Sequence, residues 1–255
     1  MTAAISIEDV AAIASAAGDA VLRLYRDSGA WVRRKQDGSP VTAADMASED
    51  VIRPRLAALD PAIPYLSEEA PLPAHAERRG WQRFWLVDPL DGTKEFLRRT
   101  DEFTVNIALI EAGEPVLGAV AAPALGVVYY AARRQGAWKR RRGRQPERIR
   151  SRLADPRQPL RVVESRSHPS PELEDFLAGY TIRERLKVGS SLKFCLLAEG
   201  RADIYPRLGP TMEWDVGAGD CVYRHSAAGE PHPSPLTYNK PSLRNDRFVL
   251  GLQPS

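Results

Sequence analysis

Two closely spaced carboxylates, Asp88 and Asp91, follow an apolar run at residues 84–87 and carry the clearest chemistry in this sequence. A rigid proline comes directly after Asp88, so the two acids share one tight turn. Like charges that converge in this way favour a bound cation. Ligand sets made of oxygen atoms alone suit Mg²⁺ or Mn²⁺. A plain turn without a metal is the alternative, because Asp-Pro and Asp-Gly pairs also mark ordinary turns.

Gly92 and Thr93 follow the second carboxylate and lead into a short helix predicted at residues 94–99. Backbone amides at the start of a helix bind phosphate readily, because their N–H groups have no partner within the helix. The segment therefore combines a candidate cation site with a candidate phosphate site.

Three further acidic residues could complete such a site. Glu68 follows a short strand predicted at residues 64–67, Asp45 falls in the first turn of a predicted helix, and Asp215 opens another helix directly after Trp214. Taken singly, Glu68 is explained as a solvated surface acid, Asp45 as a helix-capping residue and Asp215 as an N-cap. Their occurrence together favours one shared site.

Two helices and a polar link are predicted in the first quarter of the chain. Apolar residues on one face predict a helix over residues 7–27, and a second capping signal at Thr42 predicts another helix from there to about residue 59. Pro54 should bend or interrupt the second helix. The link between the two contains a turn at residues 37–40.

Short apolar strands, separated by Gly, Pro and charged turns, dominate from residue 64 onward. Three strands that lie close together predict an antiparallel meander, at residues 104–111, 115–123 and 126–132. Later elements are a strand at 161–165, a helix ended by Gly200, a strand at 202–207 and a helix from Trp214 to Gly229. Both cysteines fall on these helices and are predicted to be small core residues. The mixture predicts an α+β protein of two halves.

Composition excludes several classes of protein. The chain has 255 residues, of which 43% are hydrophobic and 27% are charged, so it can bury a sizeable core. No uncharged apolar run is long enough to span a membrane, and the N-terminus lacks the features of a signal peptide, which predicts the cytoplasm. Two cysteines and four histidines without a close cluster argue against a disulfide framework and a zinc site.

A basic tract at residues 139–152 accounts for the positive net charge. It holds eight Lys and Arg residues and one Glu, and the rest of the chain has a net charge of −4. Such a tract could bind nucleic acid or an anionic lipid surface. The simpler interpretation is a solvated, loop-like turn between strands, since no aromatic residue alternates with the arginines as in single-strand binders.

The dispersed acidic residues, taken in order, resemble the signature of the lithium-sensitive, magnesium-dependent phosphatases related to inositol monophosphatase. The resemblance is greatest to one branch, the CysQ-type 3'(2'),5'-bisphosphate nucleotidases. The fragments that carry it are residues 39–45, 84–96, 102–110, 165–168 and 189–207. It implies a layered αβαβα sandwich of two halves: residues 1–150 with most metal ligands, and residues 151–255 with the nucleotide contacts and Asp215.

The resemblance also implies a ligand set for two Mg²⁺ ions. The first would be held by Glu68, Asp88 and the backbone carbonyl of Leu90, and the second by Asp88, Asp91 and Asp215. A third, weaker ion would touch Glu68. Paired ions of this kind activate water and stabilise a leaving oxygen.

Catalytic and substrate-binding roles are implied in the same way. Thr93 and Glu68 would position the attacking water, while Asp45 would orient the threonine hydroxyl. His168 could approach the nucleotide or serve as a turn residue. The implied substrate contacts are Glu68, Leu90, Asp91, Gly92, Thr93, Ser190, Lys193, Arg207 and Asp215.

The expected activity is hydrolysis of adenosine 3',5'-bisphosphate to AMP and phosphate, which clears a by-product of sulfate assimilation. An inositol monophosphatase or a fructose-1,6-bisphosphatase is the alternative, because the metal ligands would be the same; a nucleotide-binding protein without turnover is another. We expect a small-molecule substrate and no nucleic-acid partner. We further expect a monomer or homodimer without an integral membrane segment. Its expected location is the cytoplasm, including the cytoplasmic face of the inner membrane.

Overall fold

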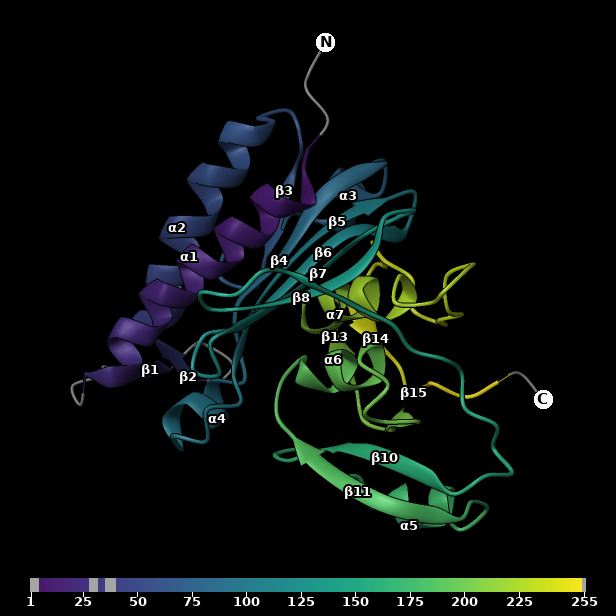
Figure 1. Cartoon of the computed structure of the whole chain (residues 1–255). Coiled ribbons are helices and arrows are strands. Elements are labelled where there is room, and N and C mark those ends of the chain that lie inside the picture. Colours follow the sequence, from purple (N-terminus) through teal and green to yellow (C-terminus); the bar gives the residue numbers. More distant parts are fainter. Residues whose placement is uncertain (1–4, 28–31, 35–39, 254–255) are drawn as a thin grey trace.

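A seven-stranded mixed sheet forms the central layer of the protein (Figure 1). The computed structural model describes residues 5–27, 32–34 and 40–253, without the side chains of residues 32–34 and 40–42. The sheet has the order β3-β4-β5-β6-β7-β8-β9, and β3 is parallel to β4 while all other neighbours are antiparallel. Its strands are β3 (Tyr65–Ser67), β4 (Arg83–Asp91), β5 (Thr104–Glu111), β6 (Glu114–Ala122), β7 (Val127–Ala132), β8 (Gly136–Arg141) and β9 (Glu147–Ile149). The predicted meander is confirmed as β5-β6-β7.

Helices α1 (Ile7–Arg26) and α2 (Ala43–Leu59) cover one face of this sheet (Figure 1). The Ser6 side chain caps α1 by accepting a hydrogen bond from the Glu8 amide, and the apolar face of the helix packs on β5, β6 and β7. Helix α2 continues through Pro54, so the predicted interruption is wrong. A proline removes one backbone donor, and packing against α1 along the helix outweighs that loss. The side chain of Thr42, which was predicted to cap α2, and residues 37–39 of the predicted turn lie outside what the structure describes.

Helices α6 (Leu192–Ala198) and α7 (Glu213–Arg224) pack on the opposite face of the sheet. Gly118 of β6 lets α7 approach closely, because a Cβ atom there would lie 2.5 Å from the Cβ of Cys221. Helix α7 ends at Arg224 and not, as predicted, at Gly229. The buried Ser226 hydroxyl donates to the Tyr223 carbonyl and contacts Ser151, which turns the chain out of the helix.

A smaller layer lies beyond α6 and completes the fold. Strands β10 (Leu160–Ser165) and β11 (Ile182–Val188) form a parallel pair, with α6 on one side and α5 (Leu173–Leu177) on the other (Figure 1). The order of layers is therefore α1 and α2, the main sheet, α6 and α7, the β10–β11 pair, and α5. The predicted α+β, αβαβα sandwich is confirmed.

The remaining elements are short. The antiparallel pairs are β1 (Val32–Arg34) with β2 (Pro40–Thr42), β12 (Tyr205–Arg207) with β15 (Phe248–Leu250), and β13 (Thr211–Met212) with β14 (Arg244–Asn245); the short helices are α3 (His75–Arg78) and α4 (Thr93–Leu97). Both cysteines are free and buried, as predicted. Among the described residues, none of the helices is both long and apolar enough to cross a bilayer. The halves divided at residue 150, the assembly state and the cellular location stay predictions.

The basic tract 139–152 is more ordered than a loop-like turn. Its first residues belong to β8, a short turn follows, and β9 returns along the sheet edge. Lys139 points inward and is bonded to Glu199 at 2.8 Å, where both side chains are mostly buried. The prediction of a surface turn between strands thus holds for residues 142–146, whereas the flanking residues are strand.

Candidate active site

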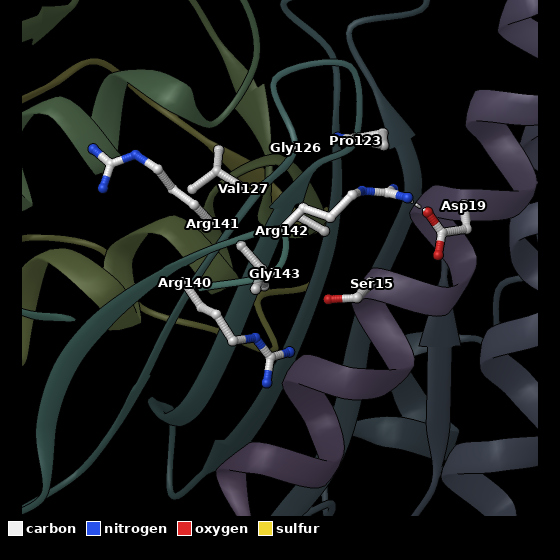
Figure 2. Close-up of a pocket in the computed structure, with 11 residues that line it drawn as sticks. Ser15, Asp19, Pro123, Gly126, Val127, Arg140, Arg141, Arg142 and Gly143 are labelled. Carbon is white, nitrogen blue, oxygen red and sulfur yellow. Dashed lines mark hydrogen bonds and ion pairs between the residues drawn. The ribbon is translucent and has the colours of Figure 1, made fainter. Parts of the chain in front are cut away.

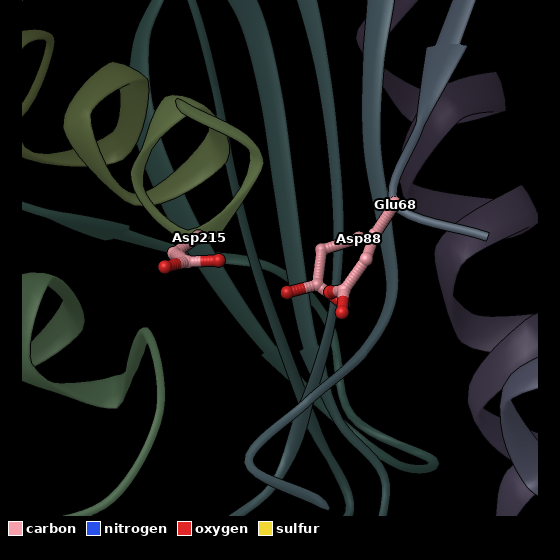
Figure 3. Close-up of side chains that lie close together, drawn as sticks. All are labelled: Glu68, Asp88 and Asp215. Carbon is pink, nitrogen blue, oxygen red and sulfur yellow. The ribbon is translucent and has the colours of Figure 1, made fainter. Parts of the chain in front are cut away.

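Three carboxylates from distant parts of the chain converge at one end of the main sheet (Figure 3). Glu68 directly follows β3, Asp88 lies near the end of β4, and Asp215 lies in the first turn of α7. Each offers an oxygen atom, and these atoms all lie within 4.8 Å of one another. The parallel pairing of β3 with β4 places Glu68 next to Asp88, and α7 presents Asp215 from the opposite face.

The end of β4 departs from regular pairing between Asp88 and Asp91. The Leu90 amide donates to the Asp88 carboxylate at 3.0 Å, which closes a tight turn within the strand. Gly92 then adopts a left-handed conformation with φ of +89°, which favours glycine, and α4 begins at Thr93. The Thr93 hydroxyl lies 3.5 Å from the Leu90 carbonyl oxygen. The predicted turn is thus present. It places the carboxylates of Asp88 and Asp91, the Leu90 carbonyl and the Thr93 hydroxyl on the same side of the site.

Mutual repulsion shows that this cluster is suited to a cation. Burial raises the pKa of Asp88 well above its usual range, and the charges of Glu68, Asp91, Asp215 and Asp45 raise it further. Burial, with repulsion from Asp91, raises the pKa of Asp215 to about 8. Such a group of acids is stable in its charged form when a cation neutralises it. Because every donor is an oxygen atom, Mg²⁺ fits the residues present.

Two buried side chains that the sequence interpretation missed connect the ligands. The Asn106 amide of β5 donates to Asp91 at 3.3 Å and to the Ser191 hydroxyl at 3.0 Å. Ser191 in turn donates to the backbone carbonyl of Asp215 at 2.6 Å. An asparagine within an otherwise apolar strand is the signal that could have found this link, because a buried polar side chain needs partners.

Another missed acid, Glu49 of α2, fixes the end of β3. Its carboxylate accepts hydrogen bonds from the Tyr65 hydroxyl at 2.8 Å and from the Ser67 hydroxyl at 2.9 Å. Ser67 directly precedes Glu68, so this contact sets the position of Glu68 in the acidic cluster. Asp45 lies four residues before Glu49 on the same helix, or about one turn, and is itself buried, with 3% of its surface exposed.

Cationic and hydroxyl groups lie across the site from the carboxylates. Lys193 of α6 is buried, which lowers the pKa of its ammonium to about 8 even though Asp91 opposes that shift. Its ammonium donates to the Ser190 carbonyl at 2.5 Å. In the described part of the chain, the buried Ser190 hydroxyl and the Nε of Arg207 have no hydrogen-bond partner. Unsatisfied buried donors of this kind are suited to a ligand oxygen.

One cleft of about 220 Å³ joins the two sets of groups. The predicted residues that line it are Glu68, Asp88, Leu90, Asp91, Gly92, Thr93, His168, Ser190, Lys193, Arg207 and Asp215. Asp45 is not among the lining residues, although it is close enough for its charge to raise the pKa of Asp88. The Lys94 ammonium lies 2.9 Å from the ring Nε2 of His168 and can donate a hydrogen bond to it. The cleft therefore has an acidic end and a cationic end.

A sequence profile of the inositol monophosphatase family matches residues 4–240. The chain belongs to the inositol monophosphatase family. Members of this family depend on a metal ion, and the acidic cluster described above could hold one. The predicted resemblance is confirmed.

Similar proteins from this family cover nearly the whole chain. The 3'(2'),5'-bisphosphate nucleotidase CysQ of Salmonella typhimurium is 53% identical over 217 residues, which are 85% of this chain and 86% of the relative. The protein of the same name from Escherichia coli strain K12 is 50% identical over 253 residues, or 96% and 99% of the two chains. The crystal structure of CysQ from Bacteroides thetaiotaomicron matches with a TM-score of 0.80 and 37% identity, covering 97% and 98% of the chains.

Proposed function

We propose that this member of the inositol monophosphatase family is a Mg²⁺-dependent 3'(2'),5'-bisphosphate nucleotidase that hydrolyses adenosine 3',5'-bisphosphate to AMP and phosphate. The observation that carries the proposal is the cleft with an acidic end and a cationic end. A substrate with two phosphates needs both, one end for the phosphate that is cleaved and the other for the phosphate that is kept. The relatives that bear this nucleotidase name support the same conclusion.

We assign two Mg²⁺ ions to the acidic end. Glu68, Asp88 and the Leu90 carbonyl would hold the first, and Asp88, Asp91 and Asp215 would hold the second. When bound, these ions supply acidity for the attacking water and positive charge opposite the leaving oxygen. A third, weaker ion at Glu68 belongs to the same proposal.

The remaining catalytic groups would position the water. Glu68 and the Thr93 hydroxyl lie on the cleft wall, where they can accept a proton from water and orient it toward phosphorus. Asp45, buried at the start of α2, acts through these groups and does not touch the substrate in this proposal. Attack by water needs no covalent intermediate, so no further nucleophile is required.

The cationic end would recognise the retained phosphate. Lys193 and Arg207 provide positive charge, and the unpartnered Ser190 hydroxyl and Arg207 Nε provide free donors. A guanidinium binds two phosphate oxygens at once. The amides of Gly92 and Thr93 would face the phosphate that is cleaved. Substrate choice therefore depends on the cationic end, since the metal ligands would serve any phosphate ester.

A phosphate-release assay with a panel of substrates tests this proposal. Adenosine 3',5'-bisphosphate should be hydrolysed faster than inositol 1-phosphate or fructose 1,6-bisphosphate, and EDTA should abolish turnover. Asp88→Asn should lower kcat by about 100-fold or more, because charge that the ions share is lost. A preference for inositol phosphate would assign the chain to the inositol phosphatases. Tight binding of the bisphosphate without turnover in Mg²⁺ would make it a non-catalytic nucleotide binder.

A further inference from the structure

A second hollow lies between helix α1 and the turns that join β6 to β7 and β8 to β9 (Figure 2). Its volume is about 230 Å³, and it shares no lining residue with the catalytic cleft. Ser15 and Asp19 line it from α1, and Arg140, Arg141 and Arg142 line it from the β8–β9 hairpin. The rest of the lining is largely apolar: Ala121, Pro123, Val127 and Val128. The hollow thus combines an apolar surface with a cationic rim.

Backbone contacts fix the two turns that form this rim. The Arg142 amide donates to the Gly126 carbonyl at 2.8 Å, which joins the β8–β9 turn to the β6–β7 turn. Gly126 and Gly143 both adopt left-handed conformations, with φ of +62° and +71°. The Arg142 side chain therefore starts from a fixed backbone position.

The arginines of the tract differ in their partners. Arg141 is bonded to Glu147 at 2.8 Å and points away from α1, whereas Arg142 reaches Asp19 at 2.5 Å (Figure 2). Arg140 lies over the Tyr130 ring, and among the described residues no carboxylate lies within ion-pair distance of it. The Arg142–Asp19 pair is exposed, with side-chain exposures of 65% and 47%. Exposed pairs are weak, so a doubly charged anion can displace Asp19 from Arg142.

A neighbouring hollow of about 210 Å³ extends this positive surface along α1. Its lining residues are Asp19, Leu22, Arg23, Arg26 and Arg142. Because Asp19 and Arg142 line both hollows, the two form one groove that is divided by this ion pair. Asp19 is the one acid among the described residues that line either hollow. Five arginines line the two hollows with it: Arg23 and Arg26 of α1, and Arg140, Arg141 and Arg142 of the β8–β9 hairpin.

We propose that this groove binds a small organic molecule with two phosphate groups, one held by Arg140 and Arg142 and the other by Arg142, Arg23 and Arg26. The planar guanidinium matches phosphate oxygens bidentately. Each hollow has room for one phosphate, and the apolar wall can contact the organic part of the ligand. This site is separate from the proposed nucleotidase reaction and does not rest on it.

A small ligand fits these observations better than a nucleic-acid strand. Proteins that bind single strands stack bases on exposed aromatic rings. The exposed large hydrophobic side chains of the described residues are Met46, Leu72, Leu97 and Leu125, none of them aromatic. Tyr130 and Trp138, which lie near the arginines, stack on each other and are at least partly buried.

Calorimetric titration of the full chain with pyrophosphate tests the proposal. The protein is kept in EDTA at low ionic strength, so that no metal holds the probe in the catalytic cleft. Replacing Arg140 and Arg142 together by Gln should weaken binding at the groove by about 10- to 100-fold, as expected for loss of charge-assisted contacts. Arg144→Gln is the matched control, because Arg144 belongs to the same turn and lines neither hollow. It should change the affinity less than 2-fold, and circular dichroism should show that all variants are folded.

Further variants and probes have outcomes that would contradict the proposal. Arg207→Gln removes a cation of the catalytic cleft, so groove binding should survive in it. If Arg207→Gln abolishes all pyrophosphate binding, the cleft holds the probe and the groove does not. Equal weakening by Arg144→Gln and by the double variant would show diffuse surface charge and no built site. An RNA oligonucleotide that binds more tightly than pyrophosphate at about 0.2 M salt would identify a polymer as the partner and overturn the small-ligand assignment.

Discussion

Replacing Asp215 by asparagine tests whether the acidic cluster is arranged for a cation at the expense of stability. In the metal-free protein, burial and the charge of Asp91 raise the pKa of Asp215 to about 8. Asparagine has the same shape, and its side-chain oxygen can still accept the hydrogen bond that the Met212 amide donates to Asp215 at 2.8 Å. The substitution therefore removes the charge and keeps the contact at the start of α7.

The sign and size of the effect follow from the pKa. An acid whose pKa is higher in the folded than in the unfolded chain destabilises the fold wherever the unfolded form is ionised. For Asp215 this loss begins near pH 4 and grows until about pH 8. Full burial would make it about 4 kcal/mol at pH 7, and contact with solvent in the cleft reduces it to roughly 2–3 kcal/mol. Asp215→Asn should raise the Tm of the metal-free protein by about 5–10 °C at pH 7.

Thermal unfolding in EDTA and in saturating Mg²⁺, at pH 4 and pH 7, measures this effect. In EDTA, the Tm of the variant should be higher than that of the wild type at pH 7 and equal to it near pH 4. Mg²⁺ should raise the Tm of the variant less than that of the wild type. Asp220→Asn is the control, because Asp220 is a buried acid of the same helix that is bonded to Arg224 and Tyr238. Burial also raises the pKa of Asp220, but its loss would leave the guanidinium of Arg224 without its buried counter-charge, so this variant should lose stability with or without Mg²⁺. A lower Tm for Asp215→Asn in EDTA, with the full gain from Mg²⁺, would refute the reasoning.

Three further predictions concern the substrate, the ions and the basic tract. Arg207→Ala should lower kcat/KM on adenosine 3',5'-bisphosphate by about 10- to 150-fold and change hydrolysis of inositol 1-phosphate little, and equal losses on both would contradict its role. Lithium, with nearly the radius of Mg²⁺ and half its charge, should inhibit turnover where Na⁺ at the same ionic strength does not. Replacing Arg140, Arg141 and Arg142 together by Ser should leave basal kcat unchanged in the phosphate-release assay, whereas a loss above about 3-fold would place the tract in catalysis.

Local patterns predicted most of the secondary structure and the metal-site residues. Helix α1 and the three strands of the meander are determined by residues close together in the sequence. Their predicted ends lie within a few residues of the observed ones. The acidic cluster could be predicted because Asp88 and Asp91 share one turn. Residue type and position make Glu68 and Asp215 candidates for the same site, but their roles as ligands are implied only by the family resemblance. Their approach to Asp88 depends on the pairing of β3 with β4 and on the packing of α7.

What the sequence interpretation missed depends on contacts between distant segments. The parallel pairing of β10 with β11 joins strands that a helix separates. Three consecutive charged residues at 183–185 also interrupt the alternation of apolar and polar residues that would have predicted β11. The roles of Asn106 and Glu49 depend on hydrogen-bond partners that lie far away in the sequence. Glycine ends many helices, so the sequence predicts Gly229 as the end of α7. The helix instead ends at Arg224, where the buried Ser226 hydroxyl donates back to the Tyr223 carbonyl.

The close approach of β6 and α7 at Gly118 ties metal affinity to a position in the hydrophobic core. Asp215 lies six residues before Cys221 on α7, or about 9 Å along the helix axis. A methyl group at position 118 would press on Cys221 and on the helix backbone, which a rigid helix passes on to its first turn. Inherited variation in apolar residues far from the cleft can therefore alter how tightly the acidic cluster would hold a cation, while every carboxylate stays the same.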